Sequence, residues 1–286
     1  TQRSVGPTPV TRLSDGSGGP AVVVAHGFAG SRQMMLGYGL VLAQAGYTVH
    51  LFDFEGHGQH PVPMSGDVSA INGTTRLLVT QTQEVIEAAR QGDTPVALLG
   101  HSMATDILVR AASETDGIGP LVLLSAFSLA IDDTHPADLL LITGAWEPGL
   151  RDFALEAEAM GGDRRAALIA PASDHVSILH SRAGRAAALD WLNGFYDRDR
   201  TTPVRQTGWA ILALLGAVTA LAWPLARLLP DRAQRVEPLG ARHFALVVLT
   251  PLIAAPLLAA PIDTRLLPVL VADYLALHLA LYGALQ

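Results

Sequence analysis

The chain has 286 residues, no cysteine and a formal net charge of −7 at pH 7. The absence of cysteine excludes disulfides, thiol catalysis and cysteine-bound metals. The acidic balance, with no cluster of basic residues, excludes a nucleic-acid partner, because phosphate contacts need concentrated cations. Half of the residues are apolar and only 16% are charged, so the composition predicts that part of the chain lies in a lipid bilayer.

Residues 1–200 alternate between short apolar runs and longer stretches with apolar residues three and four positions apart, the pattern of β–α–β units. The predicted strands are 21–26, 47–52, 95–100, 120–125, 138–144 and 166–170. The predicted helices are 31–45, 70–91, 102–113, 149–160 and 177–196. Runs such as VVVAH, VALLGH and LVLLSA are typical of strands buried on both faces. We therefore expect a doubly wound, mostly parallel α/β sheet.

The composition changes after a polar linker, predicted at 201–206. Three apolar stretches follow, at 209–229, 244–262 and 266–285, each close to the roughly 20 residues that a helix needs to cross a bilayer. Buried helices of a soluble domain are the alternative, but three successive runs without a polar face favour the membrane. We expect an integral membrane region of about three transmembrane helices in 207–286, with the lipid bilayer as partner.

Other properties of this region stay open. The arginines near the ends of the apolar stretches number four on each side, so the positive-inside rule does not decide which side of the membrane residues 1–200 occupy. Asp273 and His278 lie in the last stretch, where ionisable groups are costly, and either an ion or proton function or helix-to-helix hydrogen bonding explains them. Because the sequence begins at Thr1 and ends at Gln286 after an apolar run, truncation at both ends, further membrane segments and further subunits also stay open.

The strongest local motif is Gly100-His-Ser-Met-Ala104, which follows a predicted strand and opens a predicted helix. A serine on such a strained turn needs small residues two positions before and after it, and Gly100 and Ala104 meet that demand, although the usual pattern has glycine at the second position. Ser102 is therefore the candidate nucleophile; a simple helix cap is the alternative.

Two other motifs follow predicted strands. His26-Gly-Phe28 comes after the first strand, where the backbone N–H of Phe28 is placed to form an oxyanion hole with the N–H of Met103, the residue after the nucleophile. Asp53-Phe-Glu-Gly-His-Gly58 comes after the second strand and supplies a tight turn at the rim. His26 and His101 are expected to make local hydrogen bonds.

These three motifs, in this order and each at a strand end, resemble the α/β-hydrolase superfamily over residues 10–196. The resemblance implies a serine esterase or lipase that cleaves small-molecule or lipid acyl esters through an acyl-enzyme, without a cofactor or a metal. It also implies an acid and then a histidine later in the chain. His175, after the last predicted strand, is the predicted base, whereas His180 is expected inside the last helix.

Gly144-Ala-Trp-Glu147 resembles the family's Gly-x-x-Asp turn with glutamate in place of aspartate, so Glu147 is the predicted acid and Asp152 the reserve. Only about a dozen residues, 127–137, stand where many relatives carry a lid of helices, so we expect an open site suited to a bulky or membrane-presented substrate. An acyltransferase or thioesterase with the same triad is an alternative function. A non-catalytic binding module of a membrane protein is another.

Overall fold

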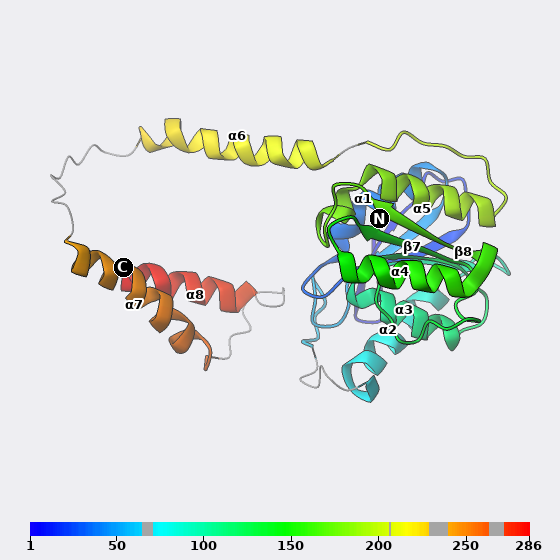
Figure 1. Cartoon of the computed structure of the whole chain (residues 1–286), viewed down its shortest axis with the longest axis horizontal. Coiled ribbons are helices and arrows are strands. Elements are labelled where there is room, and N and C mark those ends of the chain that lie inside the picture. Colours follow the sequence, from blue (N-terminus) through cyan, green and yellow to red (C-terminus); the bar gives the residue numbers. More distant parts are fainter. Residues whose placement is uncertain (65–70, 206, 229–239, 263–271) are drawn as a thin grey trace. The chain divides into compact units, whose positions relative to one another are not determined.

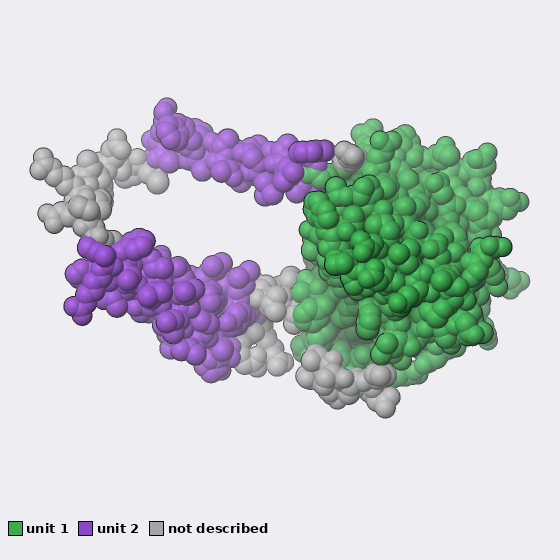
Figure 2. Space-filling model, viewed as in Figure 1, with its two compact units in different colours: residues 1–208 green, residues 209–286 purple. Residues whose placement is uncertain are grey.

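The computed structural model describes residues 1–64, 71–205, 207–228, 240–262 and 272–286 (Figure 1). The chain divides into two compact units, Thr1–Gly208 and Trp209–Gln286 (Figure 2). Four pieces of the predicted elements lie outside the described residues: residue 70 of a helix, residue 206 of the linker, and residues 229 and 266–271 of the apolar stretches.

The first unit contains an eight-stranded sheet in the order β1-β2-β4-β3-β5-β6-β7-β8. Its strands are β1 (Gln2–Val5), β2 (Thr8–Leu13), β3 (Ala21–Ala25), β4 (Thr48–Phe52), β5 (Val96–His101), β6 (Ile118–Leu124), β7 (Leu139–Gly144) and β8 (Arg165–Ala170). All pairs from β4 to β8 are parallel, whereas β1–β2 and β2–β4 are antiparallel. The mostly parallel sheet is therefore confirmed, and the six predicted strands correspond to β3–β8.

Helices cover both faces of this sheet (Figure 1). They are η1 (Arg32–Met35), α1 (Leu36–Gln44), η2 (Ile71–Thr75), α2 (Arg76–Ala89), α3 (Met103–Ser113), α4 (Pro148–Gly161), η3 (Gly162–Arg164), η4 (Ser177–His180) and α5 (Arg182–Phe195). Successive strand residues point to opposite faces: Val23 packs in one core with α2, α3 and α4, and Val22 packs in the other with α1 and α5. The strands read as unbroken apolar runs because both faces are buried.

Two details of the first unit differ from the sequence-based expectation. The hairpin β1–β2 was not predicted, because its residues are largely exposed or half-buried and lack a continuous apolar run. His180 does not lie inside the last helix. It is the last residue of the short helix η4. A separate helix, α5, begins after Ser181, whose hydroxyl caps it by accepting a hydrogen bond from the N–H of Gly184.

The strand order reverses beside β3. From β3 the chain adds β4 on one side and then crosses back to add β5 on the other. Ligands of open α/β sheets bind outside the carboxyl ends of the strands at such a reversal. The motif residues follow β3 and β5, at the two sides of the reversal, and Glu147 and His175 follow β7 and β8 at the same edge.

The second unit is helical, with α6 (Gly208–Ala226), α7 (Ala241–Ala259) and α8 (Ala272–Leu285). By length and composition, α6 and α7 are able to cross a membrane. The described part of α8 has 14 residues, about 21 Å of helix, which is less than the roughly 30 Å of a bilayer core. This helix packs on α7. Within α8, the ring of His278 lies 5.9 Å from the ring of Tyr274.

Candidate active site

Ser102 occupies a strained turn between β5 and α3. Its φ of 53° and ψ of −120° lie in a region that costs a non-glycine residue about 1–3 kcal/mol. A Cβ atom at Gly100 would approach Leu108 Cδ1 to 2.6 Å and Ala104 Cβ to 3.3 Å. A side chain at position 100 would therefore force Leu108 to move, whereas the methyl group of Ala104 fits in the buried helix start.

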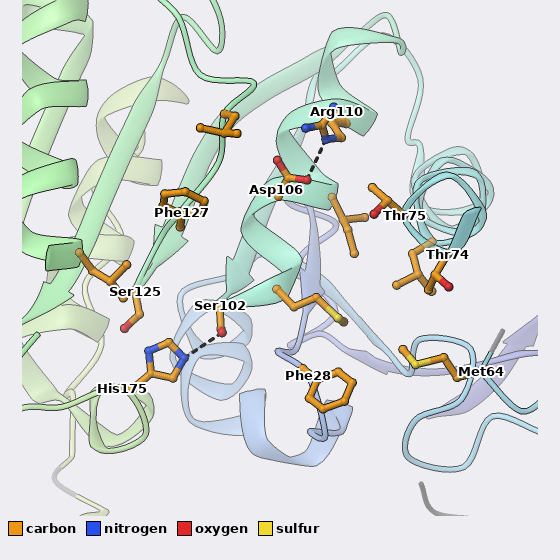
Figure 3. Close-up of a pocket in the computed structure, with 15 residues that line it drawn as sticks. Phe28, Met64, Thr74, Thr75, Ser102, Asp106, Arg110, Ser125, Phe127 and His175 are labelled. Atoms are coloured by element: carbon orange, nitrogen blue, oxygen red, sulfur yellow. Dashed lines mark hydrogen bonds and ion pairs between the residues drawn. The ribbon is translucent and has the colours of Figure 1, made fainter. Parts of the chain in front are cut away.

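The structure brings Ser102, His175 and Glu147 into one hydrogen-bonded chain. His175 Nε2 lies 2.8 Å from Ser102 Oγ (Figure 3), and His175 Nδ1 lies 2.7 Å from Glu147 Oε1. In this arrangement Nδ1–H donates to the carboxylate, which leaves Nε2 as the acceptor for the serine hydroxyl.

The carboxylate of Glu147 is buried and fixed on both sides. Its Oε2 accepts hydrogen bonds from Ser125 Oγ at 2.7 Å and from the N–H of Gly144 at 2.9 Å. A Cβ at Gly144 would lie 2.9 Å from that oxygen and 2.4 Å from the carbonyl oxygen of Ser173, so the turn needs glycine there. Ser125 was not predicted; its signal was its place directly after β6 at the same sheet edge.

Asp152, the reserve acid, lies elsewhere. It sits on α4 with its side chain 65% exposed, and its carboxylate pairs with Arg151 at 3.4 Å. Among the described residues it has no hydrogen bond to His175. The geometry therefore favours Glu147 as the partner of the histidine.

His101 fixes the loop that carries His175. Its Nε2–H donates to the backbone carbonyl of His175 at 2.7 Å, and burial lowers the pKa of His101 to about 4. The imidazole is therefore neutral near pH 7, with its one N–H used in this bond. The expected hydrogen bond is present, but its partner lies 74 positions away in the sequence.

His26 holds the turn after β3. Its Nδ1–H donates to the carbonyl of Gly27 at 2.7 Å, as expected for a local contact, and its Nε2 accepts from the N–H of Phe54 at 3.2 Å. Burial lowers the pKa of His26 to about 4, so the ring is neutral. A Cβ at Gly27 would come within 3.0 Å of Ser102 Cβ, so this turn runs directly beside the candidate nucleophile.

The backbone N–H groups of Phe28 and Met103 are available to a ligand. In the part of the chain that the structure describes, neither donates a hydrogen bond. Both residues line the same cavity as Ser102. Their positions suit the two donors of an oxyanion hole.

Asp53 links two of the loops beside the site. It is fully buried, forms an ion pair with the guanidinium of Arg32, and accepts from the N–H groups of Arg32 at 2.7 Å and Gln59 at 2.8 Å. The carboxylate thus ties the turn after β4 to the segment after β3. This motif therefore shapes the rim of the site without touching Ser102.

A cavity of about 630 Å³ opens beside the serine. Eight apolar and seven polar residues line it: Phe28, Met64, Thr74, Thr75, Leu78, Ser102, Met103, Asp106, Ile107, Arg110, Ser125, Phe127, Leu129, Leu150 and His175. Within the described ranges, no group of three or more His, Asp or Glu side chains is arranged to hold a metal ion.

The sheet order and the placement of this site define an α/β-hydrolase fold. Residues 19–150 match the family described as serine aminopeptidase, S33. That span includes Phe28, Ser102 and Glu147 but ends before His175. A search of curated protein sequences finds no significant match.

Solved structures resemble the chain over about two thirds of its length. A predicted CIB-like hydrolase from Thermoplasma acidophilum has 15% identity and a TM-score of 0.56, over 68% of this chain and 97% of that one. Dienelactone hydrolase from Anabaena variabilis has 20% identity and a TM-score of 0.55, over 68% and 96%. Est1E from Butyrivibrio proteoclasticus, with bound ferulic acid, has 14% identity and a TM-score of 0.55, over 69% and 100%. At these identities the likeness is one of fold.

Proposed function

We propose that this protein is a serine hydrolase that cleaves carboxylic esters through an acyl-enzyme. The observation that carries the proposal is the hydrogen-bonded chain from Ser102 through His175 to Glu147, 2.8 Å and 2.7 Å long at its two links. A hydroxyl so placed loses its proton to the imidazole as it attacks, and the buried carboxylate stabilises the imidazolium that forms.

The reaction follows from these positions. Ser102 Oγ attacks the ester carbonyl carbon while His175 Nε2 takes its proton, and the N–H groups of Phe28 and Met103 bind the negatively charged oxygen. The C–O bond to the alcohol then breaks, and the alcohol leaves with the proton from His175. A water molecule attacks the acyl-enzyme in the same way, and the free acid departs as Ser102 regains its proton.

The cavity lining favours an ester with a lipophilic part. Its volume of about 630 Å³ falls in the range of roughly 300–1,000 Å³ that holds small molecules. The name of the matching family refers to peptides, but an aminopeptidase needs a carboxylate for the substrate amine. The one carboxylate among the described lining residues, Asp106, is already paired with Arg110 at 2.7 Å, so we favour an ester over a peptide.

We also propose that the second unit anchors the enzyme in a bilayer. No residue of α6 is buried within the described part of the chain, as expected for a helix whose surroundings are lipid rather than protein. Trp209 and Trp223 lie near its two ends and are exposed, where tryptophan favours the membrane surface. Release of the full-length chain from membranes by detergent, and not by alkaline carbonate, would support this; release by carbonate would contradict it.

A fluorophosphonate probe tests the hydrolase proposal directly. We expect it to label the full-length chain in detergent and to label Ser113→Ala, a control serine on the exposed end of α3, to the same extent. The variant Ser102→Ala should not be labelled. A folded wild-type chain without labelling would contradict the proposal and favour a non-catalytic binding module. Product analysis with added alcohols or thiols separates hydrolysis from acyl transfer.

A further inference from the structure

The cavity has a second polar end on α3. Met103, Asp106, Ile107 and Arg110 all line it, and their spacing of three, four and seven places them on one face of the helix. Asp106 and Arg110 lie one and two turns beyond Ser102, about 6 and about 12 Å along the helix axis. Figure 3 shows this pair at the far end of the cavity from Ser102, with Thr75 across from it on the neighbouring helix.

Arg110 is held in place through one of its guanidinium nitrogens. Its Nε donates to Asp106 Oδ2 at 2.7 Å, and Asp106 Oδ1 in turn accepts from Ser128 Oγ at 2.7 Å. Because its partner is four residues earlier, the guanidinium folds back towards Ser102. Among the described residues, none accepts a hydrogen bond from Nη1 or Nη2 of Arg110, whose side chain is 24% exposed.

Met103 and Ile107 lie between Ser102 and Arg110 on α3 and line the cavity together with Leu78. A plain hydrocarbon chain that reached Arg110 would displace water from the Nη donors without giving them an acceptor, which is costly. A carboxylate would satisfy the donors but would leave a net negative charge, because Asp106 already balances Arg110. An uncharged oxygen acceptor fits both the donors and the charge.

The geometry points to a substrate with two oxygen functions separated by an apolar stretch. The ester lies at Ser102, and a hydroxyl or carbonyl oxygen about 6–12 Å away accepts hydrogen bonds from Nη1 and Nη2 of Arg110. Arg110 is thus a specificity-determining residue. This inference rests on the proposed ester hydrolysis for the position of the first oxygen function.

Two series of water-soluble esters test it, one with the second oxygen on the acyl part and one with it on the alcohol part. Each ester is compared with the alkyl ester of equal length, using the full-length chain in detergent. We expect kcat/KM for the oxygenated ester to be roughly tenfold higher in one series, as for a hydrogen bond from a charged donor. Arg110→Met should abolish that preference. Arg164→Met, which removes another arginine paired with an aspartate but outside the cavity, should keep it.

Binding of the same ester pairs to Ser102→Ala, measured by calorimetry, separates the two proposals. Tighter binding of the oxygenated ester that disappears in Ser102→Ala/Arg110→Met supports the Arg110 subsite, even if the wild-type chain turns over no ester. Turnover with equal rates for oxygenated and alkyl esters in both series would overturn the subsite and leave the proposed hydrolysis intact. Retention of the preference in Arg110→Met would overturn it as well.

Discussion

His175 meets Ser102 across 73 positions of sequence, with its Nε2 at 2.8 Å from the serine oxygen. The histidine belongs to no helix or strand, so its position depends on two side chains from other strand ends. Glu147 binds the Nδ1 side of the ring, and His101 binds the backbone carbonyl. The hydrogen bond between Ser102 and His175 therefore depends on loops from several strands at the carboxyl edge of the sheet. The contributions of Glu147 and His101 can each be tested.

Replacing His175 with alanine should remove ester turnover without unfolding the protein. In the proposed mechanism the imidazole accepts the proton of Ser102, and loss of such a base lowers kcat by about 10⁴–10⁶-fold. The side chain is 46% exposed, so its removal leaves little buried volume empty. Steady-state kinetics with a chromogenic ester measure the effect, and His180→Ala is the matched control with near-normal turnover. Normal turnover in His175→Ala would show that another base acts.

Glu147→Gln and Asp152→Asn distinguish the two candidate acids. Glutamine at 147 can no longer accept the Nδ1–H bond as an anion, so the imidazole loses its fixed tautomer, and we expect kcat to fall by about 10²–10⁴-fold. Asparagine at 152 changes only an exposed ion pair with Arg151, so kcat should stay within about twofold of wild type. A larger loss in Asp152→Asn than in Glu147→Gln would reverse the assignment.

His101 is expected to act as a positioning residue through its bond to the carbonyl of His175. His101→Leu removes the donor, so we expect a lower kcat with little change in KM. His101→Gln, whose amide can donate, should recover part of the loss. Equal kcat values for the leucine and glutamine variants would mean that the ring serves packing alone.

The positions of the candidate site residues and the central sheet were predictable from sequence for one physical reason. In a parallel sheet the loops after the strands meet at one edge, so residues directly after apolar runs, such as Phe28, Ser102 and Glu147, are expected near one another. The contacts of His101 and Ser125 were not predictable, because they depend on how two distant loops are aligned to within an ångström. The cavity end at Asp106 and Arg110 was also missed, since an ion pair four residues apart on a helix usually faces solvent.

The backbone of Ser102 should be a measurable cost to stability. Its φ of 53° disfavours any residue with a Cβ, whereas glycine adopts it readily. Ser102→Gly and Ser102→Ala both lack the hydroxyl of the proposed nucleophile, and we expect the free energy of unfolding of the glycine variant to be about 1 kcal/mol higher. Urea titration followed by circular dichroism compares the two. Equal stability, or a more stable alanine variant, would show that the turn is not strained.

Acid should destabilise the first unit through its buried histidines. Burial lowers the pKa of His26, His50 and His101 to about 4 in the folded protein, whereas an unfolded histidine takes a proton near pH 6.5. The unfolded chain therefore binds more protons below that pH, so stability is complete above about pH 6.5 and falls between about pH 6.5 and 4.

His50 gives the sharpest test of this pH dependence, because it lies outside the site. It sits on β4 opposite Arg12 of β2, and its pKa is lowered first by burial and then by the charges of Arg12 and Arg3. The unfolding midpoint should decrease less between pH 7 and about 4 in His50→Gln than in the wild type, because one of the buried histidines is removed. Arg12→Gln should have a smaller effect on this decrease, since the charge of Arg12 lowers the pKa of His50 less than burial does. Unfolding midpoints of the full-length chain, measured by near-ultraviolet circular dichroism across this pH range, give the comparison. An unchanged pH dependence in His50→Gln would mean that His50 takes up its proton equally in the folded and unfolded states, contrary to its burial.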